Sequence, residues 1–386
     1  MLYILYFIFF YYNINMMIIL LFILLILIAL IIAIIILSTN ANAIIGGKKK
    51  YTIQTYKLFS DDNGKFCEYL RHKLNLLGWK EADNNAKYVD FAYRPYHKKL
   101  LTDKNISKKY KHIHANLKST LNNFDKLGNK QKLATIMKHS SYIAQTEAIK
   151  DYHWKDEDII IVREIDSQKQ KGVYIVIDRP NFIQLRDMLL TEKRDAIVSK
   201  YITNPLLYKG KKFHLRMYIT IFIDKNGNKK IKYMPNYIKI ITAKKQYVIR
   251  DKIDYLDPEM NISGTGIGTN IIIFWDIDQC HHLSESSVIF FNKCNKSIYA
   301  AIDSIPLDSI LLFPEQSAGF YTYGGDIMLD DTGHAWILEL NTYPGCLVSE
   351  WWSSTHNKFN KTFIDYLSKV YDFLLDEFIL PYFGYR

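Results

Sequence analysis

The longest apolar segment of the chain lies close to its N-terminus. Residues 16–37 carry no polar side chain, and residues 2–12 before them are also apolar. A helix of that length reaches ~33 Å, comparable with the roughly 30 Å hydrocarbon core of a bilayer. The pattern predicts a single transmembrane helix at about 16–37, inside an N-terminal anchor that comprises residues 1–47.

The bases beside this segment predict its orientation. Lys48–Lys50 follow it, and no Lys or Arg precedes it. Because the cytosolic flanks of membrane helices are rich in bases, we expect a single-pass membrane protein whose remaining chain lies in the cytosol. Two alternatives stay open: a cleaved signal peptide, since Ala41–Ala43 resembles a cleavage site, and a true start at Met16 or Met17.

Beyond residue 47 the apolar positions recur every second residue in some segments and every third or fourth residue in others. This mixture predicts an α/β fold, with turns at Asn226–Gly227 and Gly333. We expect strands at 51–59, 89–93, 159–162, 172–177, 213–223, 230–241, 323–329 and 335–340, and helices at 66–77, 129–138 and 359–378.

The same pattern predicts three subdomains after the anchor. They are an N-terminal α/β subdomain at 48–120, a central subdomain at 121–195 and a C-terminal subdomain at 196–386. In the central one, two expected strands enclose the polar residues 166–171. A strand pair with a polar loop is compatible with a nucleotide lid and equally with an ordinary hairpin.

The charge balance is basic, with 50 Lys and Arg against 39 Asp and Glu and a formal net charge of +11. Such a surface attracts acidic proteins, anionic lipids or nucleic acid. Nucleic acid is the weakest of these, because no nucleic-acid-binding motif is recognisable. The apolar content of 49% excludes a disordered chain. The four cysteines form no CxxC pair, which argues against a disulfide scaffold or a structural zinc site.

Two acids and an amide lie close together in the expected C-terminal hairpin. Ile337, Glu339 and Asn341 share one strand face, and Asp326 on the other strand is expected opposite Ile337 and diagonal to Glu339. Carboxylate and amide oxygens are the ligands that Mg²⁺ prefers. The pattern predicts a magnesium site, and the alternative is a solvated strand face with ordinary acids.

A basic cluster lies at the start of the expected strand 213–223. Lys212, His214 and Arg216 alternate with apolar residues and so share one face. Because basic side chains on one face repel each other unless an anion lies between them, the cluster is typical of a phosphate site. The alternative is an edge strand protected by charge.

Four blocks of sequence, in this order, closely resemble the tubulin–tyrosine ligase-like family. They are Lys200–Leu207, Lys212–Arg216, Gly325–Asp330 and Trp336–Thr342. Further similarity at residues 77–81 and 127–133 extends the resemblance over roughly residues 65–350. Any single block is weak, and their common order makes the resemblance specific.

The resemblance implies an ATP-grasp fold and an ATP-dependent ligase that joins a free amino acid to an acceptor protein. In such an enzyme ATP phosphorylates a carboxylate, and the amine of the amino acid then displaces the phosphate. The implied cofactors are ATP and Mg²⁺. The implied partner is an acidic protein tail, with tubulin as the expected one, and the N-terminal helix would tether the enzyme to a membrane.

The resemblance also implies roles for individual residues. The implied magnesium ligands are Asp326, Glu339 and Asn341, and the implied catalytic cations are Arg216 and Lys239. The implied ATP-binding residues are Lys130, Arg163, Lys200, Tyr201, Ile202, Lys212 and His214.

Three positions differ from the family pattern. His214 stands where the family has an acidic residue, Lys239 where it has an arginine, and Ser263 is the candidate for a missing threonine. These differences keep two alternatives open. One is a catalytically impaired, membrane-anchored module that binds tubulin or microtubules, and the other is an ATP-grasp ligase for a carboxylate that does not belong to tubulin.

Overall fold

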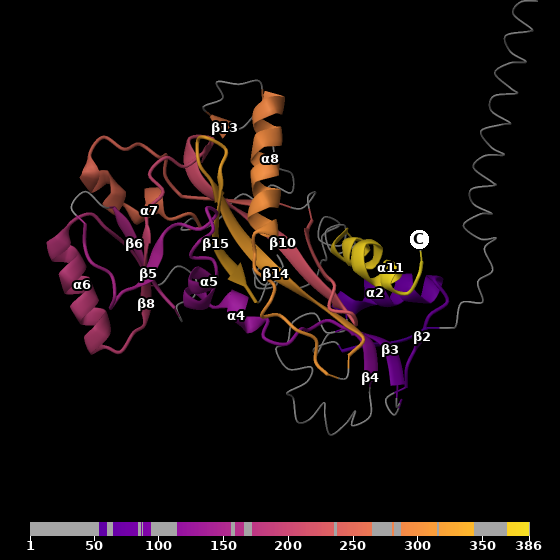
Figure 1. The fold of residues 1–386 in the computed structure, drawn as a ribbon. Helices are drawn as coiled ribbons and strands as arrows, with labels where there is room; N and C mark the ends of the chain where they lie inside the picture. Colours follow the sequence, from indigo (N-terminus) through magenta and orange to yellow (C-terminus); the bar gives the residue numbers. More distant parts are fainter. Residues whose placement is uncertain are drawn as a thin grey trace, which may run out of the picture. The chain divides into compact units, whose positions relative to one another are not determined.

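Two long antiparallel strands form the centre of the fold (Figure 1). In the computed structural model, β10 (Lys211–Asp224) pairs with β14 (Ala318–Leu329) from Leu215↔Ile327 to Asp224↔Ala318. Both strands are rich in β-branched and aromatic residues, and most of their side chains are buried on both faces. The two strands therefore make a well-packed platform for the shorter elements around them.

The structure describes the greater part of the chain after residue 53. The described residues are 54–59, 65–83, 86, 88–93, 114–155, 159–165, 172–234, 238–264, 280–281, 287–314, 316–342 and 369–385. The predicted anchor at 1–47, the predicted lid loop at 166–171 and the part of the predicted helix before residue 369 lie outside them.

No helix within these described ranges is long and apolar enough to cross a membrane. This finding corrects the localisation predicted from the sequence, a single-pass membrane protein with the rest of the chain in the cytosol. The predicted span at 16–37 lies outside the described residues, and the structure gives no support to the predicted membrane partner.

Shorter strands pair with the outer edges of β10 and β14. β11 (Lys229–Tyr233) and β12 (Lys239–Thr242) both lie against β10, and β15 (Ala335–Asn341) lies against β14. The single strand predicted at 230–241 is therefore wrong. Ile219 lies three positions after Arg216 on β10, whereas their partners Tyr233 and Lys239 lie six positions apart. Pro235, which has no N–H for a ladder, falls between the two strands.

The N-terminal elements continue the same sheet in parallel. β4 (His114–Lys118) pairs with β14, followed in order by β3 (Tyr88–Tyr93), β1 (Thr55–Leu58) and β2 (Lys80–Glu81). α2 (Lys65–Leu76) is the helix predicted at 66–77. Gly78 lies just beyond its C-terminal end, with a φ of 78° that suits a residue without a Cβ.

Helices cover both faces of this sheet. α8 (Ser287–Asp303) packs against β15 and β11 through its buried side chains, which include Cys294 and Ile298. The C-terminal helix runs from Lys369 through the π-helical turn η3 (Leu375–Ile379) to α11 (Leu380–Tyr382). It packs beside α2 over the N-terminal strands (Figure 1).

A second sheet of four antiparallel strands carries its own small core under α6 (Arg179–Thr191). Its order is β5 (Thr146–Ala148), β8 (Ala196–Lys200), β6 (Ile160–Glu164) and β7 (Val173–Val176). β6 and β7 form the strand pair predicted at 159–177. The remaining described elements are α4 (Asp125–Gly128), α5 (Lys130–Ile136), β9 (Leu207–Tyr208), η1 (Lys252–Leu256), α7 (Pro258–Asn261) and β13 (Cys280–His281).

The predicted α/β class is confirmed, and the mixed sheet is compatible with an ATP-grasp-like fold. The predicted subdomain boundaries stay predictions.

Candidate metal and nucleotide site

A β-bulge in β15 decides which side chains meet across the C-terminal hairpin. Leu329 pairs with Ala335 and Ile327 with Ile337, but Asp326 pairs with Glu339. Leu338 is thus the additional residue on β15, and beyond it the side chains change faces. The bulge places Glu339 directly across from Asp326.

The register predicted from the sequence is wrong at this point. Asp326 was expected opposite Ile337, and Ile337 was expected to share a face with Glu339. Instead Ile337 and Leu340 are both buried in the main core, at 2% and 1% exposure. The bulge lets both apolar side chains point inward, while Glu339 joins Asp326 on the other face.

Asn341 connects the two carboxylates. Its Nδ2 donates to Oε1 of Glu339 at 2.9 Å and lies 3.4 Å from Oδ2 of Asp326. Asp326 is 5% exposed, and the Glu339 side chain is 26% exposed. In the described part of the chain no group of three His, Cys, Asp or Glu could hold a metal. The trio has two acids and an amide, however, and this donor set fits Mg²⁺ once the amide turns its oxygen inward.

The guanidinium of Arg216 binds both carboxylate oxygens of Asp326, as a fork. Its Nη2 donates to Oδ2 of Asp326 at 2.9 Å, and its Nε donates to Oδ1. Burial opposes the charge on Arg216, but the carboxylates of Asp326 and Glu339 together outweigh burial and raise the pKa of the guanidinium. Lys239 pairs with Arg216 across β10 and β12, and its side chain lies outside the described part of the structure.

Lys212 and His214 precede Arg216 on the same face of β10, opposite the core side of Phe213 and Leu215. His214 Nδ1 lies 2.6 Å from Oγ of Ser263, and its Nε2 lies 3.8 Å from Oδ1 of Asp326. His214 is therefore an immediate neighbour of the trio.

Lys212 lies under an aromatic ring. It is 3% exposed, and its Nζ lies 3.8 Å from the ring centre of Tyr201. Burial lowers the pKa of Lys212 to about 7. Tyr201 donates from its hydroxyl to Oδ1 of the buried Asn261 at 2.7 Å, which holds the ring in place. Its neighbours in the predicted set, Lys200 and Ile202, are exposed and half-buried.

Two further predicted bases reach the C-terminal hairpin from other elements. Lys130, the first residue of α5, places Nζ 3.8 Å from Oε2 of Glu339. Arg163 of β6 donates from Nη1 to the carbonyl of Leu338 at 2.8 Å and from Nη2 to Oγ of Ser199 at 3.2 Å. The structure thus brings four predicted cations, Lys130, Arg163, Lys212 and Arg216, around the hairpin and the β10 face.

Sequence reasoning missed Ser199 and the Leu338 carbonyl. Ser199 lies immediately before the block of similarity that begins at Lys200, and a serine in a strand carries no signal by itself. The bulge carbonyl has no side-chain signature at all. Only pairing across strands reveals either of them.

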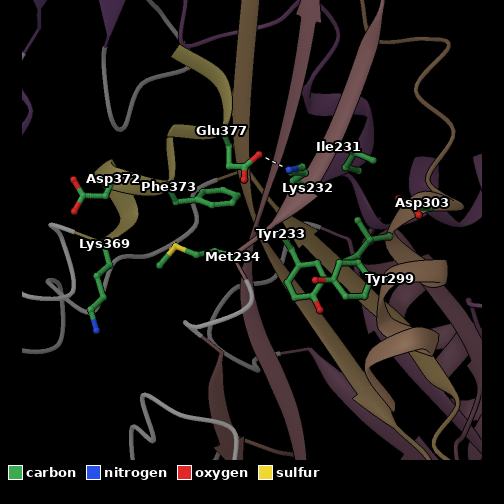
Figure 2. Close-up of a pocket in the computed structure, with 11 residues that line it drawn as sticks. Ile231, Lys232, Tyr233, Met234, Tyr299, Asp303, Lys369, Asp372, Phe373 and Glu377 are labelled. Atoms are coloured by element: carbon green, nitrogen blue, oxygen red, sulfur yellow. Dashed lines mark hydrogen bonds and ion pairs between the residues drawn. The ribbon is translucent and has the colours of Figure 1, made fainter. Parts of the chain in front are cut away.

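A separate cavity of ≈ 510 Å³ contains none of the predicted residues. It lies between β11, α8 and the C-terminal helix (Figure 2). Figure 2 shows Phe373 close to Met234 and Tyr233 next to Tyr299, and Lys232 ion-paired with Glu377. Three acids, Asp303, Asp372 and Glu377, accompany the lysines in its lining. This mixed charge is unlike the basic face of β10.

Comparison with known proteins finds similarity to one family. Residues 97–225 match the model of the tubulin-tyrosine ligase family. Human tubulin polyglutamylase TTLL5 is 26% identical over 211 residues, which is 49% of this chain and 16% of that protein. The Mus musculus protein of the same name is 26% identical over 214 residues, 49% of this chain and 15% of that protein. The match therefore spans about a sixth of the length of these relatives. The matched range 97–225 contains the predicted positions from Lys130 to Arg216, and the predicted magnesium ligands lie beyond it.

Proposed function

We propose that this chain, which is similar to the tubulin-tyrosine ligase family over residues 97–225, is an ATP- and Mg²⁺-dependent ligase. It would join an amino acid to a carboxylate of an acidic protein tail, with tubulin as the expected acceptor. The observation that carries the proposal is the meeting of Asp326, Glu339 and Asn341 beside Arg216. The mixed α/β sheet agrees with an ATP-grasp-like fold, which the proposal requires.

The proposed reaction has two steps. An oxygen of the acceptor carboxylate bonds to the γ-phosphorus of ATP, and ADP leaves. The amine nitrogen of the amino acid then bonds to the carboxyl carbon, inorganic phosphate leaves, and a proton of the amine passes to solvent. The product is an amide or isopeptide bond, and one ATP becomes ADP and phosphate.

In this proposal the side chains near the hairpin bind and orient the reactants. Asp326, Glu339 and Asn341 would hold Mg²⁺, which supplies positive charge to the transferred phosphoryl group. Arg216 lies beside the trio and supplies fixed positive charge from the protein. Lys212 lies four residues before Arg216 on the same face of β10 and beside Tyr201, where it would meet the nucleotide.

The net charge of +11 supports an acidic acceptor, because a basic surface attracts acidic tails over a long range. A second candidate is a binding module for tubulin without turnover. It is favoured by His214, which bonds to Ser263 at a position where the resemblance implies an acid. A ligase for a carboxylate of another protein is the third, and the same experiment distinguishes all three.

The test is an amino-acid incorporation assay on the full chain. It contains ATP, Mg²⁺, radiolabelled glutamate, glycine or tyrosine, and tubulin. We expect label in tubulin with one amino acid, and at least a roughly 100-fold lower rate in Glu339→Gln, since that change removes a metal-binding carboxylate. Glu259→Gln is the matched control, because Glu259 pairs with Lys244 far along the chain from the trio.

The other outcomes have distinct meanings. Absence of label with every amino acid, together with undetectable ATP binding, would leave the binding module. Label in a protein other than tubulin would favour the third candidate. Label that persists in Glu339→Gln would refute the metal assignment.

A further inference from the structure

Arg163 connects the four-stranded sheet to the β14–β15 hairpin, which carries the proposed metal ligands. Its Nη2 donates to Oγ of Ser199 on β8 at 3.2 Å, and Ser199 shares a hydrogen bond of 2.8 Å with Thr146 on β5. Its Nη1 donates to the carbonyl of Leu338 on β15 at 2.8 Å. The two terminal nitrogens of the guanidinium are therefore both bound to protein groups, one in each sheet.

The carbonyl that Arg163 binds belongs to the bulge. Leu338 is the additional residue of β15, so its backbone is left out of the regular ladder with β14. Ile337, the residue before it, donates its N–H to the carbonyl of Tyr142 at 2.8 Å instead. Two bonds from outside the hairpin thus hold the bulge, and the one from Arg163 is charge-assisted and the stronger kind.

The bulge in turn decides the position of Glu339. Because the side chains change faces at Leu338, Glu339 lies across from Asp326 and within reach of Asn341. Arg163 therefore acts on Glu339 through the backbone of the bulge.

We propose that Arg163 is a positioning residue for the divalent cation. It holds the β15 bulge so that Glu339 faces Asp326, and it sets the affinity of the trio for the cation. This role differs from the nucleotide-phosphate contact that the family resemblance implies for the same position. It rests on the proposed function in that the trio binds a divalent cation.

Two binding measurements on the full chain separate these roles. Mn²⁺ binding without nucleotide is measured by electron paramagnetic resonance, and ADP binding in EDTA by calorimetry. In Arg163→Ala we expect Mn²⁺ to bind 10- to 100-fold more weakly, as is typical when a partner of a metal ligand is removed. We expect the affinity for ADP to change less than about threefold, within the scatter of surface substitutions.

Two variants serve as controls. Arg163→Met keeps an aliphatic stem of similar size and removes the donors, so it gives the same result should the alanine variant fail to fold. Arg194→Ala removes another arginine beside the same sheet, one that pairs with Glu164 and Glu192, and both affinities should stay at the wild-type value.

The outcomes distinguish the positioning role from the nucleotide contact. Weaker Mn²⁺ binding with unchanged ADP binding supports the positioning role. Unchanged Mn²⁺ binding with weaker ADP binding overturns it and restores the nucleotide contact. If the wild-type chain itself binds no Mn²⁺, the proposed function and this inference both fail, whereas loss of the inference alone leaves wild-type binding intact.

Discussion

The fold shifts the pKa of Lys212 into the neutral pH range. Burial under the Tyr201 ring lowers its pKa to about 7 from the ordinary 10.5. At neutral pH a part of the molecules therefore carries no charge at this position. A phosphate nearby would favour the protonated form and raise the pKa again.

This shift predicts that nucleotide binding takes up a proton. Affinity for ADP should fall as pH rises from about 7 towards 9, by at most about tenfold per pH unit. Calorimetry at pH 8 in buffers of different ionisation enthalpy measures the uptake directly. Lys211→Gln, which removes the half-buried neighbour, should keep the uptake, and Lys212→Gln should lose it.

Equal proton uptake in the wild type and in Lys212→Gln would contradict the prediction.

The effect of Lys212 on stability changes with pH in the direction opposite to that of a salt-bridged base. Since folding lowers the pKa, the unfolded chain binds the proton more tightly between pH 7 and 10.5, and the contribution of Lys212 to stability rises with pH over that range.

A second prediction concerns Arg216 and Asp326. Arg216→Ala leaves the carboxylate of Asp326, which is 5% exposed, without its fork. We expect the free energy of unfolding to fall by about 3–5 kcal/mol, the usual penalty for a buried charge that loses its partner. Millimolar Mg²⁺ should restore part of this loss, because a cation at the trio replaces the missing charge.

Urea unfolding with and without Mg²⁺ checks it. Arg71→Ala removes a pair whose side chains are 32% and 35% exposed and should lower stability by about 1 kcal/mol or less. If Mg²⁺ stabilises the Arg216→Ala variant no more than the wild type, the trio does not bind the cation as proposed.

At the scale of elements, the hairpin of β14 and β15 is the decisive unit. Oδ1 of Asp330 accepts from the N–H groups of Thr332 and His334, both at 3.0 Å, and closes the turn. Gly333 follows with a φ of 82°, which favours a residue without a Cβ. The turn starts the pairing that the bulge at Leu338 later shifts.

The turn glycine should therefore be hard to replace. A Cβ at Gly333 would lie 3.3 Å from the sulfur of the buried Cys294, in addition to the backbone strain. We expect Gly333→Ala to lower the free energy of unfolding by about 1–3 kcal/mol. Gly227→Ala, in the β10–β11 turn, has a similar φ of 80° and nothing within 4 Å of its Cβ, so it isolates the strain alone.

Thermal or urea unfolding of the two variants gives the comparison. The difference between them measures the packing on Cys294. Equal losses of stability would show that packing at the turn contributes nothing.

At the scale of the whole molecule, the two ends of the described chain share one core. Tyr56, Leu74 and Phe91 from the N-terminal elements pack with Leu374 and Phe378 of the C-terminal helix. β4 also pairs with β14, so the N-terminal strands and the central platform form one sheet. The stability of the platform should therefore depend on the C-terminal helix.

Phe378→Ala tests this dependence. Its ring is 2% exposed and lies 5.9 Å from Phe222 of β10 and 5.7 Å from Phe373, measured between ring centres. Removing it should lower the free energy of unfolding by about 3–5 kcal/mol, measured by urea unfolding. Ile289→Ala on α8, which is 59% exposed, should change it by less than about 0.5 kcal/mol. A small loss for Phe378→Ala would mean that the C-terminal helix is a loosely attached part.

The sequence by itself determined the local features of this protein. The alternation of apolar and polar residues located α2, β3, the β6–β7 pair and the turns at Gly227 and Gly333, because periodicity and turn chemistry depend on neighbours along the chain. The family resemblance was likewise visible in short blocks, and the match over 97–225 confirms it.

Only the tertiary structure decided how these parts meet. The bulge at Leu338, the fork of Arg216 on Asp326 and the bond from Arg163 to the bulge each join residues that lie far apart in the chain. The break between β11 and β12 likewise appears only when both are paired with β10. Strand register is set by pairing and burial across the sheet, and local pattern contains no information about which residue of one strand will face which residue of another.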